Sequence, residues 1–472
     1  MQTAAEGSTK AIRQIEQFKR IVGDIWVFVD EENLNKYAHD ETENLHFLPD
    51  IVIKPRSAEE ISAIMLICND HRIPVTPRGA GTGLSGGALP QFGGVLISTE
   101  RMNSILNIDE RNLQVTTEPG VITELLQNAV KEKGLFYPPD PSSRGSCFIG
   151  GNIAENSGGP KAVKYGVVKD YVLNLELVLP TGEIIWTGAN VLKNSTGYNL
   201  TQLVVGSEGT LGIVTKIVLK LLPHPKYDLL MLVPFNSLEK AGEAVSAIFR
   251  AGFIPSALEL VEVDALKIVS RFVESTAVPV GDDVAAHLII EVDGNHPENL
   301  LSEMESISAL LAEFDCGEVY FADDAQQKAE LWKLRRRVAE AVKLDGYTIE
   351  EDTVVPRAEL PALIRGVKAL GKQYDFHAVC YGHAGDGNLH IRIKKPGSIY
   401  SLDNPDVIPA LTALFELVKG LGGTISGEHG IGLVQKAYMP VVFPATNMEL
   451  MKGIKKIFDP NNILNSGKIF DS

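Results

Sequence analysis

Apolar residues near the start of the chain recur at helical spacing. Ile12, Ile15, Phe18 and Val22 fall on one face, which predicts a helix over about residues 11–22. Such an apolar stripe must be covered by other parts of the fold, so we expect this helix to dock on a domain surface.

The next segment predicts a β-α-β unit. Short apolar runs at Ile51–Ile53 and Ile73–Thr76 are typical of strands, and Ser57 and Glu60 have the spacing of a capping box at a helix start. The helix between the strands has an apolar face made of Ile61, Ile64, Met65 and Cys68. This unit leads directly into a glycine-rich stretch.

A second unit of the same kind follows. It comprises a strand at Gln114–Thr117, a helix at Thr123–Lys133 and a strand at Leu135–Tyr137. Further along, a β-rich run ends where Pro223 and Pro225 interrupt it, which indicates a domain boundary.

The pattern changes after about residue 227. Two β-α-β alternations follow, with strands at Leu229–Val233, 256–261, His287–Val292 and Glu318–Phe321 and helices at 237–251 and 297–314. This alternation is closer to a ferredoxin-like sheet than to a doubly wound one, so the predicted fold class is α+β.

The stretch Pro77–Gly87 is the densest in glycine. Backbone of this kind can bend sharply and approach a ligand, and its successive N–H groups can form an anion-binding concavity. Arg78, Thr82 and Ser85 lie within it, which favours a diphosphate cradle over a flexible surface loop.

The cradle is not a Rossmann motif, although the letters Gly-x-Gly-x-x-Gly begin at Gly81. That motif must open a helix. Here Pro90, Gly93 and Gly94 follow, and then an apolar strand at Val95–Ser98. Because proline and glycine interrupt helices, the diphosphate would meet loop amides.

Two short segments near the carboxyl end, Tyr381–His390 and Ser426–Gly432, hold three of the ten histidines. The glycines between His383 and His390 exclude a helix, so a tight loop must bring the two imidazoles together. After the loop, alternation puts His390 and Arg392 on one face of a strand. A lone buried histidine usually belongs to the core, but two imidazoles near a carboxylate favour an open divalent-metal site, which a zinc hydrolase could also use.

Composition narrows the class of protein. The 472 residues, 44% hydrophobic and 22% charged, are typical of a globular chain of two or three domains. A net charge of −16 argues against nucleic acid or an anionic membrane as the partner. The four cysteines lie far apart with no C-x-x-C, so no iron–sulfur or zinc-ribbon site is predicted. No signal-peptide pattern and no long apolar run is present, so we expect a cytoplasmic protein with reduced thiols.

Three glycine segments, at 77–87, 150–159 and 206–214, together resemble the FAD domain of the vanillyl-alcohol oxidase / p-cresol methylhydroxylase superfamily. With the carboxyl half included, residues from about 45 to 470 resemble the glycolate oxidase / D-lactate dehydrogenase / D-2-hydroxyglutarate dehydrogenase family (FAD-binding oxidoreductase/transferase type 4).

This resemblance implies a two-subdomain FAD-binding domain over residues 1–224. It implies a ferredoxin-like substrate (cap) domain with a metal site over 225–425. The segment 426–472 would complete the active site and return to the FAD domain.

The resemblance also implies which residues contact FAD. They are Pro77, Arg78, Gly79, Gly81, Thr82, Gly83, Leu84, Ser85, Pro139, Asp140, Ser142, Gly145, Gly150, Gly151, Asn152, Asn156, Gly158, Gly159, Tyr165, Gly166, Glu208, Gly209, Gly212, Ile213, Val214 and Asn465. Some relatives hold flavin covalently through a histidine, which these glycine loops lack. Non-covalent FAD is therefore expected, with Cys147 as the one residue that leaves the question open.

For the chemistry, the resemblance assigns His383, His390 and Glu428 as metal ligands and His429 as the base. Zinc is the expected metal, with manganese, iron and cobalt as alternatives. The metal would lower the pKa of the substrate hydroxyl, His429 would take the proton, and hydride would pass from the α-carbon to the flavin.

Arg335 aligns with the carboxylate-binding arginine of the family. The alternative is a solvated helix face, because Arg336 and Arg337 adjoin it and the three cannot all point inward. A bidentate guanidinium suits a carboxylate, so we expect Arg335, together with Arg392 and His429, to bind substrate.

Two departures from the hydroxyglutarate-specific members concern the second carboxylate. Those members have a threonine and a lysine where this chain has Ala339 and Glu350, and an asparagine where it has Arg392. Glu350 would repel a distal carboxylate unless Arg392 or Lys394 replaces the lost charge. This favours D-lactate or glycolate over D-2-hydroxyglutarate.

Three functions remain open at this point. A D-2-hydroxy-acid dehydrogenase would need a separate acceptor: an electron-transfer flavoprotein, a quinone-linked partner or a cytochrome. A non-redox transferase of the alkylglycerone-phosphate synthase type would need a lipid-facing surface, for which no amphipathic anchor is evident. A non-catalytic FAD subunit would not need the histidines. A homodimer is compatible with all three.

Overall fold

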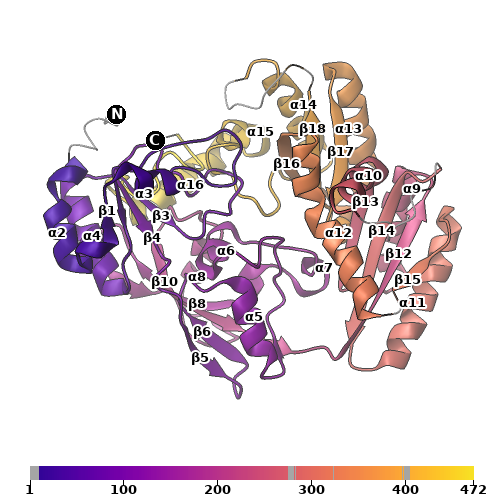
Figure 1. The fold of residues 1–472 in the computed structure, drawn as a ribbon, viewed down its shortest axis with the longest axis horizontal. Coiled ribbons are helices and arrows are strands. Elements are labelled where there is room, and N and C mark those ends of the chain that lie inside the picture. The colour runs from indigo at the N-terminus through magenta and orange to yellow at the C-terminus, as the bar shows by residue number, and fades with distance from the viewer. Residues whose placement is uncertain are drawn as a thin grey trace. The chain divides into compact units, whose positions relative to one another are not determined.

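The computed structural model describes residues 10–274, 281, 283–322, 324–395, 397 and 404–471, which form two compact units (Figure 1). The first unit contains the residues up to Ser157, Val167–His224 and the residues from Glu428 on. The second contains Gly158–Gly166 and Pro225–Gly427.

The first unit begins with a four-stranded sheet in the order β1 (Val27–Phe28), β2 (Ile51–Ile53), β4 (Val95–Ser98) and β3 (Val75–Arg78). Strands β2 and β3 are both parallel to β4. The predicted strand at Ile73–Thr76 thus begins two residues later and extends to Arg78.

Two helices accompany this sheet and lie side by side in Figure 1: α2 (Ile15–Val22) and α4 (Ala58–His71). The predicted cap of α4 is confirmed, because Ser57 Oγ accepts a hydrogen bond from the Glu60 backbone N at 3.3 Å. Its predicted apolar face is fully buried. In the predicted amino-terminal helix, Phe18 and Val22 are buried as expected, whereas Ile12 is 52% exposed.

A five-stranded antiparallel sheet completes the first unit. Its order is β5 (Ile105–Asp109), β6 (Gln114–Thr117), β10 (Ile213–Lys220), β8 (Val172–Val178) and β9 (Ile184–Trp186), and a separate strand pair joins β7 (Leu135–Phe136) to β11 (Leu222–Pro223). The described residues of this unit also form the helices α3 (Glu31–Lys36), α5 (Thr123–Lys131), α6 (Ile149–Glu155), α8 (Leu200–Val204), α15 (Met439–Val442) and α16 (Ala445–Phe458).

The second unit is built on one seven-stranded sheet in which all neighbours are antiparallel. Its order is β15 (Tyr320–Ala322), β12 (Tyr227–Phe235), β14 (Ala286–Gly294), β13 (Ala257–Glu262), β17 (His377–Gly382), β18 (Asn388–Lys394) and β16 (Ile349–Val354). Helix α9 (Leu238–Arg250) connects β12 to β13, and β14 lies between these two strands in the sheet. This arrangement matches the predicted ferredoxin-like pattern.

Helices cover this sheet, so its central strands are buried. Helices α10 (Val263–Phe272) and α12 (Ala325–Leu344) pack on one face in a shared apolar cluster. The unit also contains α7 (Ala162–Tyr165), α11 (Pro297–Leu311), α13 (Leu360–Tyr374) and α14 (Ile408–Gly420). A charged residue on such a strand loses its hydration and therefore needs a partner inside the protein.

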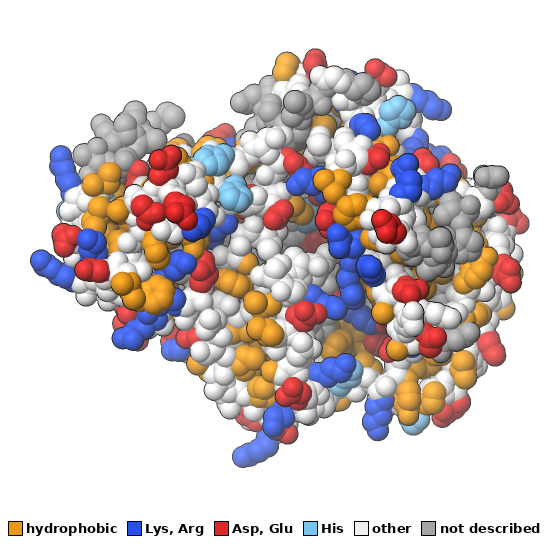
Figure 2. Space-filling model, viewed as in Figure 1, with side chains coloured by type: hydrophobic (Ala, Val, Ile, Leu, Met, Phe, Trp, Pro, Cys, Tyr) orange, Lys and Arg blue, Asp and Glu red, His pale blue; other side chains and the backbone are white. Residues whose placement is uncertain are grey.

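Acidic, basic and apolar side chains are interspersed over much of the face seen in Figure 2. Within the described part of the chain, the helices are all too short or too polar to span a bilayer.

Candidate active site

The predicted diphosphate cradle, Pro77–Gly87, begins in the last two residues of β3 and continues in the loop after this strand. Arg78, the last residue of the strand, is 7% exposed and donates from Nη1 to the Tyr37 carbonyl at 3.3 Å. Gly81 has φ +78°, and a Cβ there would lie 2.1 Å from Arg78 Nη2. All residues between β3 and β4 are described, and they contain no helix, so the loop differs from a Rossmann turn as predicted.

Segments far apart in sequence hold this loop within the first unit. Asn465 Nδ2 donates to the carbonyls of Gly87 at 3.0 Å and Glu208 at 2.8 Å. The Glu208 carboxylate accepts from the backbone N atoms of Ile431 and Gly432, each at 2.7 Å. The cradle, the 206–214 segment and the chain just after His429 are therefore connected.

The cradle contains buried polar atoms without hydrogen bonds to any described residue and glycine backbone with free space beside it. Both features are suited to a bound dinucleotide. Ser85 Oγ, Glu155 Oε2 and Asn465 Oδ1 are buried and have no hydrogen-bond partner in the part of the chain that the structure describes. A Cβ built at Gly83 or Gly151 would meet no atom of the described residues within 4 Å. Buried polar atoms are normally satisfied, so these atoms indicate a polar ligand.

The other residues predicted to contact FAD do not all lie beside the cradle. Gly209 adjoins Pro77, and Gly79 adjoins Gly151 in the first turn of α6, a helix that the glycine pairs of this segment did not predict. Ser142 and Gly145 are exposed. Four predicted contacts belong to the second unit instead: Gly158, Gly159, Tyr165 and Gly166.

Burial shifts the pKa values of charged side chains beside the cradle. Burial lowers the pKa of Lys468 to about 7, while its Nζ donates to the carbonyls of Gly86 at 2.8 Å and Leu89 at 2.5 Å. Burial also raises the pKa of Glu155 and of Glu208, and Glu208 further raises that of Glu155. Cys147 is buried here, with its Sγ 3.3 Å from Thr123 Oγ1.

Two residues of the predicted histidine site, His383 and His390, lie in the second unit, directly after β17 and on the neighbouring strand β18 (Figure 1). His390 pairs across the sheet with Tyr381 on one side and Asp352 on the other. The predicted tight loop is present, because β17 and β18 form a hairpin with His383 directly after β17. The rings of His383 and His390 are 5.5 Å apart and nearly perpendicular at 79°.

These two histidines can present ligand atoms to one ion. A ring nitrogen of His383 and one of His390 lie within 4.8 Å of each other, and the residues are 3% and 6% exposed. His390 Nδ1 is also 3.8 Å from Glu350 Oε1 and 3.9 Å from Asp352 Oδ1.

Arg335 points inward from α12, as the substrate-binding interpretation requires. It is 4% exposed, and its Nε donates to Glu259 Oε2 at 2.6 Å. The second oxygen of Glu259 accepts from His383 Nδ1 at 2.8 Å. Burial alone would raise the pKa of Glu259, but Arg335 and His383 hold it at about 2. Arg336 and Arg337 are partly exposed, which separates them from Arg335.

Arg392 and Glu350 form a buried ion pair with each other. Arg392 Nε also donates to the Tyr381 hydroxyl at 3.4 Å, and this tyrosine is fully buried. Lys394 reaches the Asp345 carbonyl at 2.7 Å instead. The charge of Arg392 is therefore balanced by Glu350.

Glu428 and His429 follow Gly427, the last residue of the second unit. Gly427 N donates to Asp352 Oδ2 at 2.8 Å, so the chain is fixed one residue before Glu428. In the first unit, a Cβ at Gly430 would lie 2.2 Å from Glu155 Oε2, which places the residue after His429 beside the cradle.

Sequence reasoning missed Glu259 and Asp352. Glu259 was visible as an acid within the apolar run Ala257-Leu258-Glu259-Leu260-Val261, whereas Asp352 follows two further acids, Glu350 and Glu351, so no apolar run marks it. An acid in an otherwise apolar strand signals a buried partner, but the sequence does not show which one.

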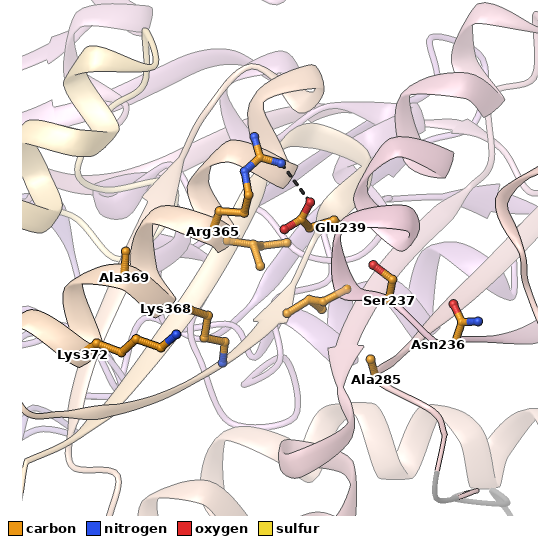
Figure 3. A pocket seen from close by; sticks show the side chains of 10 residues that line it. Asn236, Ser237, Glu239, Ala285, Arg365, Lys368, Ala369 and Lys372 are labelled. Carbon is orange, nitrogen blue, oxygen red and sulfur yellow. Dashed lines mark hydrogen bonds and ion pairs between the residues drawn. The ribbon is translucent and has the colours of Figure 1, made fainter.

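A separate hollow of about 620 Å³ lies in the second unit, between the start of α9 and α13 (Figure 3). Arg365 Nη1 pairs there with Glu239 Oε2 at 3.1 Å (Figure 3). Lys368, which also lines the hollow, pairs with Glu262 at 2.5 Å. None of the histidine-site residues lines this hollow.

Comparisons with known proteins agree with this architecture. Residues 49–188 match the FAD binding domain family, and residues 224–469 match the family of FAD linked oxidases, C-terminal domain. The chain is 42% identical to the glycolate oxidase subunit GlcD of Bacillus subtilis over 448 residues, covering 93% of each chain. It is 38% identical to a D-lactate dehydrogenase of Anaerostipes hadrus over 460 residues, covering 96% of each.

A solved structure of p-cresol methylhydroxylase with substrate bound has the same fold. The TM-score is 0.80 at 18% identity, over 98% of this chain and 97% of the other. The chain therefore belongs to the family of FAD-linked oxidases, and it is an FAD-linked oxidoreductase with the p-cresol methylhydroxylase type of fold.

Proposed function

We propose that this protein oxidises a small D-2-hydroxy monocarboxylic acid, with D-lactate and glycolate favoured, to the 2-oxo acid. Arg335 carries the proposal. Its guanidinium is buried and held through Nε, yet Nη2 has no hydrogen-bond partner among the described residues. A buried donor left open in this way is suited to a substrate carboxylate, for which guanidinium is the preferred partner.

We further propose that His383, His390 and Glu428 bind a divalent metal. Two imidazoles and one carboxylate suit zinc, and also manganese, iron or cobalt. The support is the close approach of the two histidines and the fixed position of Gly427, directly before Glu428.

His429 is the proposed base, since a neutral imidazole can accept a proton in the physiological pH range. When bound, the metal would lower the pKa of the substrate hydroxyl and FAD would accept the hydride from the α-carbon. Arg335 would hold the carboxylate so that the α-carbon keeps one orientation.

The Glu350–Arg392 pair supports a monocarboxylic substrate. Its two charges balance each other, so the second carboxylate of D-2-hydroxyglutarate would have to compete with Glu350 for Arg392. The electrons would then leave for a separate acceptor, such as an electron-transfer flavoprotein, a quinone-linked partner or a cytochrome.

The test is the visible spectrum of the protein loaded with FAD and Zn²⁺ under anaerobic conditions. D-Lactate, glycolate, D-2-hydroxyglutarate and L-lactate are added separately. We expect D-lactate or glycolate to bleach the oxidised flavin band fastest. A flavin band that none of these acids bleaches would contradict the proposal and favour a non-redox transferase or a non-catalytic FAD subunit.

A further inference from the structure

We propose that Glu259 is a positioning residue whose single carboxylate sets both the tautomer of His383 and the orientation of Arg335. The inference rests on the proposed function, because it assigns a role within the same site. Glu259 would act through its two neighbours and would touch neither substrate nor metal.

The geometry divides the two oxygens of Glu259 between two partners. Oε1 accepts from His383 Nδ1 at 2.8 Å, and Oε2 accepts from Arg335 Nε at 2.6 Å. Glu259 is completely buried in the middle of β13. Both hydrogen bonds are therefore shielded from water, which makes their geometry strongly preferred.

An ionised carboxylate can only accept hydrogen bonds, so Nδ1 of His383 must carry the ring proton. Nε2 then keeps its lone pair, which a metal ligand requires. A carboxylate behind a ligating histidine fixes its tautomer and its ring orientation in this way.

The same carboxylate binds only the Nε side of the Arg335 guanidinium, so Nη2 is available to a ligand. Nε donates to Glu259, and no described residue offers Nη2 a hydrogen-bond partner. Glu259 thus directs one positively charged edge toward a ligand while it orients the histidine that would hold the metal.

A glutamine at this position can satisfy only one of the two donors. Its amide oxygen could accept from His383 or from Arg335, but its NH₂ group would face the other N–H. Either the histidine changes tautomer or the arginine loses its support. An aspartate keeps two accepting oxygens but reaches less far.

Glu262 provides a matched control on the same strand. It is 7% exposed, pairs with Lys368 at 2.5 Å and accepts from Cys380 N at 2.8 Å. Glu262→Gln therefore removes a comparable buried charge from β13 without contact to a site histidine.

The experiment measures Zn²⁺ affinity by competition with a chromophoric chelator, using full-length metal-free protein without hydroxy acid. We expect Glu259→Gln to weaken Zn²⁺ binding by about 10–100-fold and Glu262→Gln to keep an affinity within about threefold of wild type. The Zn²⁺ affinity of Glu259→Asp should lie between those of Glu259→Gln and wild type. Melting temperatures of the two glutamine variants separate this effect from general destabilisation.

A second readout is anaerobic flavin reduction by D-lactate, in which Glu259→Gln should also raise the KM through Arg335. Equal Zn²⁺ affinities of Glu259→Gln and Glu262→Gln would overturn the inference, as would wild-type protein that binds no Zn²⁺. Wild-type protein that binds Zn²⁺ but is not reduced by any hydroxy acid would contradict the proposed function alone, and the comparison of the two variants would still decide the role of Glu259.

Discussion

Asp352 Oδ2 accepts a hydrogen bond from the Gly427 backbone N at 2.8 Å, which fixes the chain directly before Glu428. The other oxygen accepts from Asn388 Nδ2 at 2.6 Å, and Asp352 is 1% exposed. Gly427 has no room for a side chain, since a Cβ would lie 2.6 Å from Asn388 Nδ2. One buried carboxylate therefore connects the strand paired with His390 to Gly427, the last residue of the second unit.

Asp352→Asn should release this segment. The new NH₂ group would face either Gly427 N–H or the Asn388 amide, so one hydrogen bond must be lost. We expect the rate of anaerobic flavin reduction at saturating D-lactate to fall by about 10–100-fold, with a smaller change in KM, because the proposed ligand and base would be displaced. The exposed Asp345, changed to Asn, is the control, and equal rates in the two variants would contradict the expectation.

Glu350→Gln should change substrate preference. Without its carboxylate partner, Arg392 gains an uncompensated charge that can bind a distal carboxylate. A hydrogen bond to a charged group contributes about 1.5–3 kcal/mol, so we expect kcat/KM for D-2-hydroxyglutarate to rise at least about tenfold relative to D-lactate. Glu350→Asp keeps the charge and should change the ratio less. An unchanged ratio in Glu350→Gln would mean that the Glu350–Arg392 pair does not set specificity.

Gly81→Ala should abolish retention of FAD. The backbone has φ +78°, and the new Cβ would displace the Arg78 guanidinium that it would approach to 2.1 Å. Gly134→Ala is the control, because Gly134 has a similar backbone conformation, φ +70°, and a Cβ there would meet no described atom within 4 Å. This substitution should lower the free energy of unfolding by only about 1–2 kcal/mol. The measurement is the ratio of flavin to protein absorbance after gel filtration. Full flavin content in Gly81→Ala would disprove this role of the loop.

Alkylation of the native protein at pH 8 should be confined at first to Cys316. Burial raises the pKa of Cys380 to about 12 and also raises that of Cys68, so neither forms thiolate readily. Cys147 is buried as well. Burial also raises the pKa of Cys316, but its side chain is partly exposed and therefore accessible to the reagent. We expect iodoacetamide to label Cys316 at least about tenfold faster by peptide mass spectrometry, and denatured protein should label at all four positions. Early labelling of Cys380 would show that its strand opens.

Local features of the fold followed from local sequence. The Ser57 cap, the buried face of α4 and the strands at Ile51–Ile53 and Gln114–Thr117 are where the pattern predicts them. Helix α6 was missed because Gly150 and Gly151 have low helix propensity, and tertiary packing overrides such a preference. The helical spacing predicts that Ile12 is buried, but it is exposed. Apolar periodicity identifies the face of a helix that can pack, but it does not show how much of that face the rest of the fold covers.

The sequence by itself determined the elements of the chemistry: a glycine cradle, two histidines on a tight hairpin and an arginine on a helix. These depend on spacing within a few residues, which hydrogen-bond geometry and side-chain size control directly. Only the tertiary structure decided that Glu259 meets both His383, 124 residues away, and Arg335, 76 residues away. Strand order arises from packing summed over the whole sheet, so no local pattern could assign these partners to a buried charge.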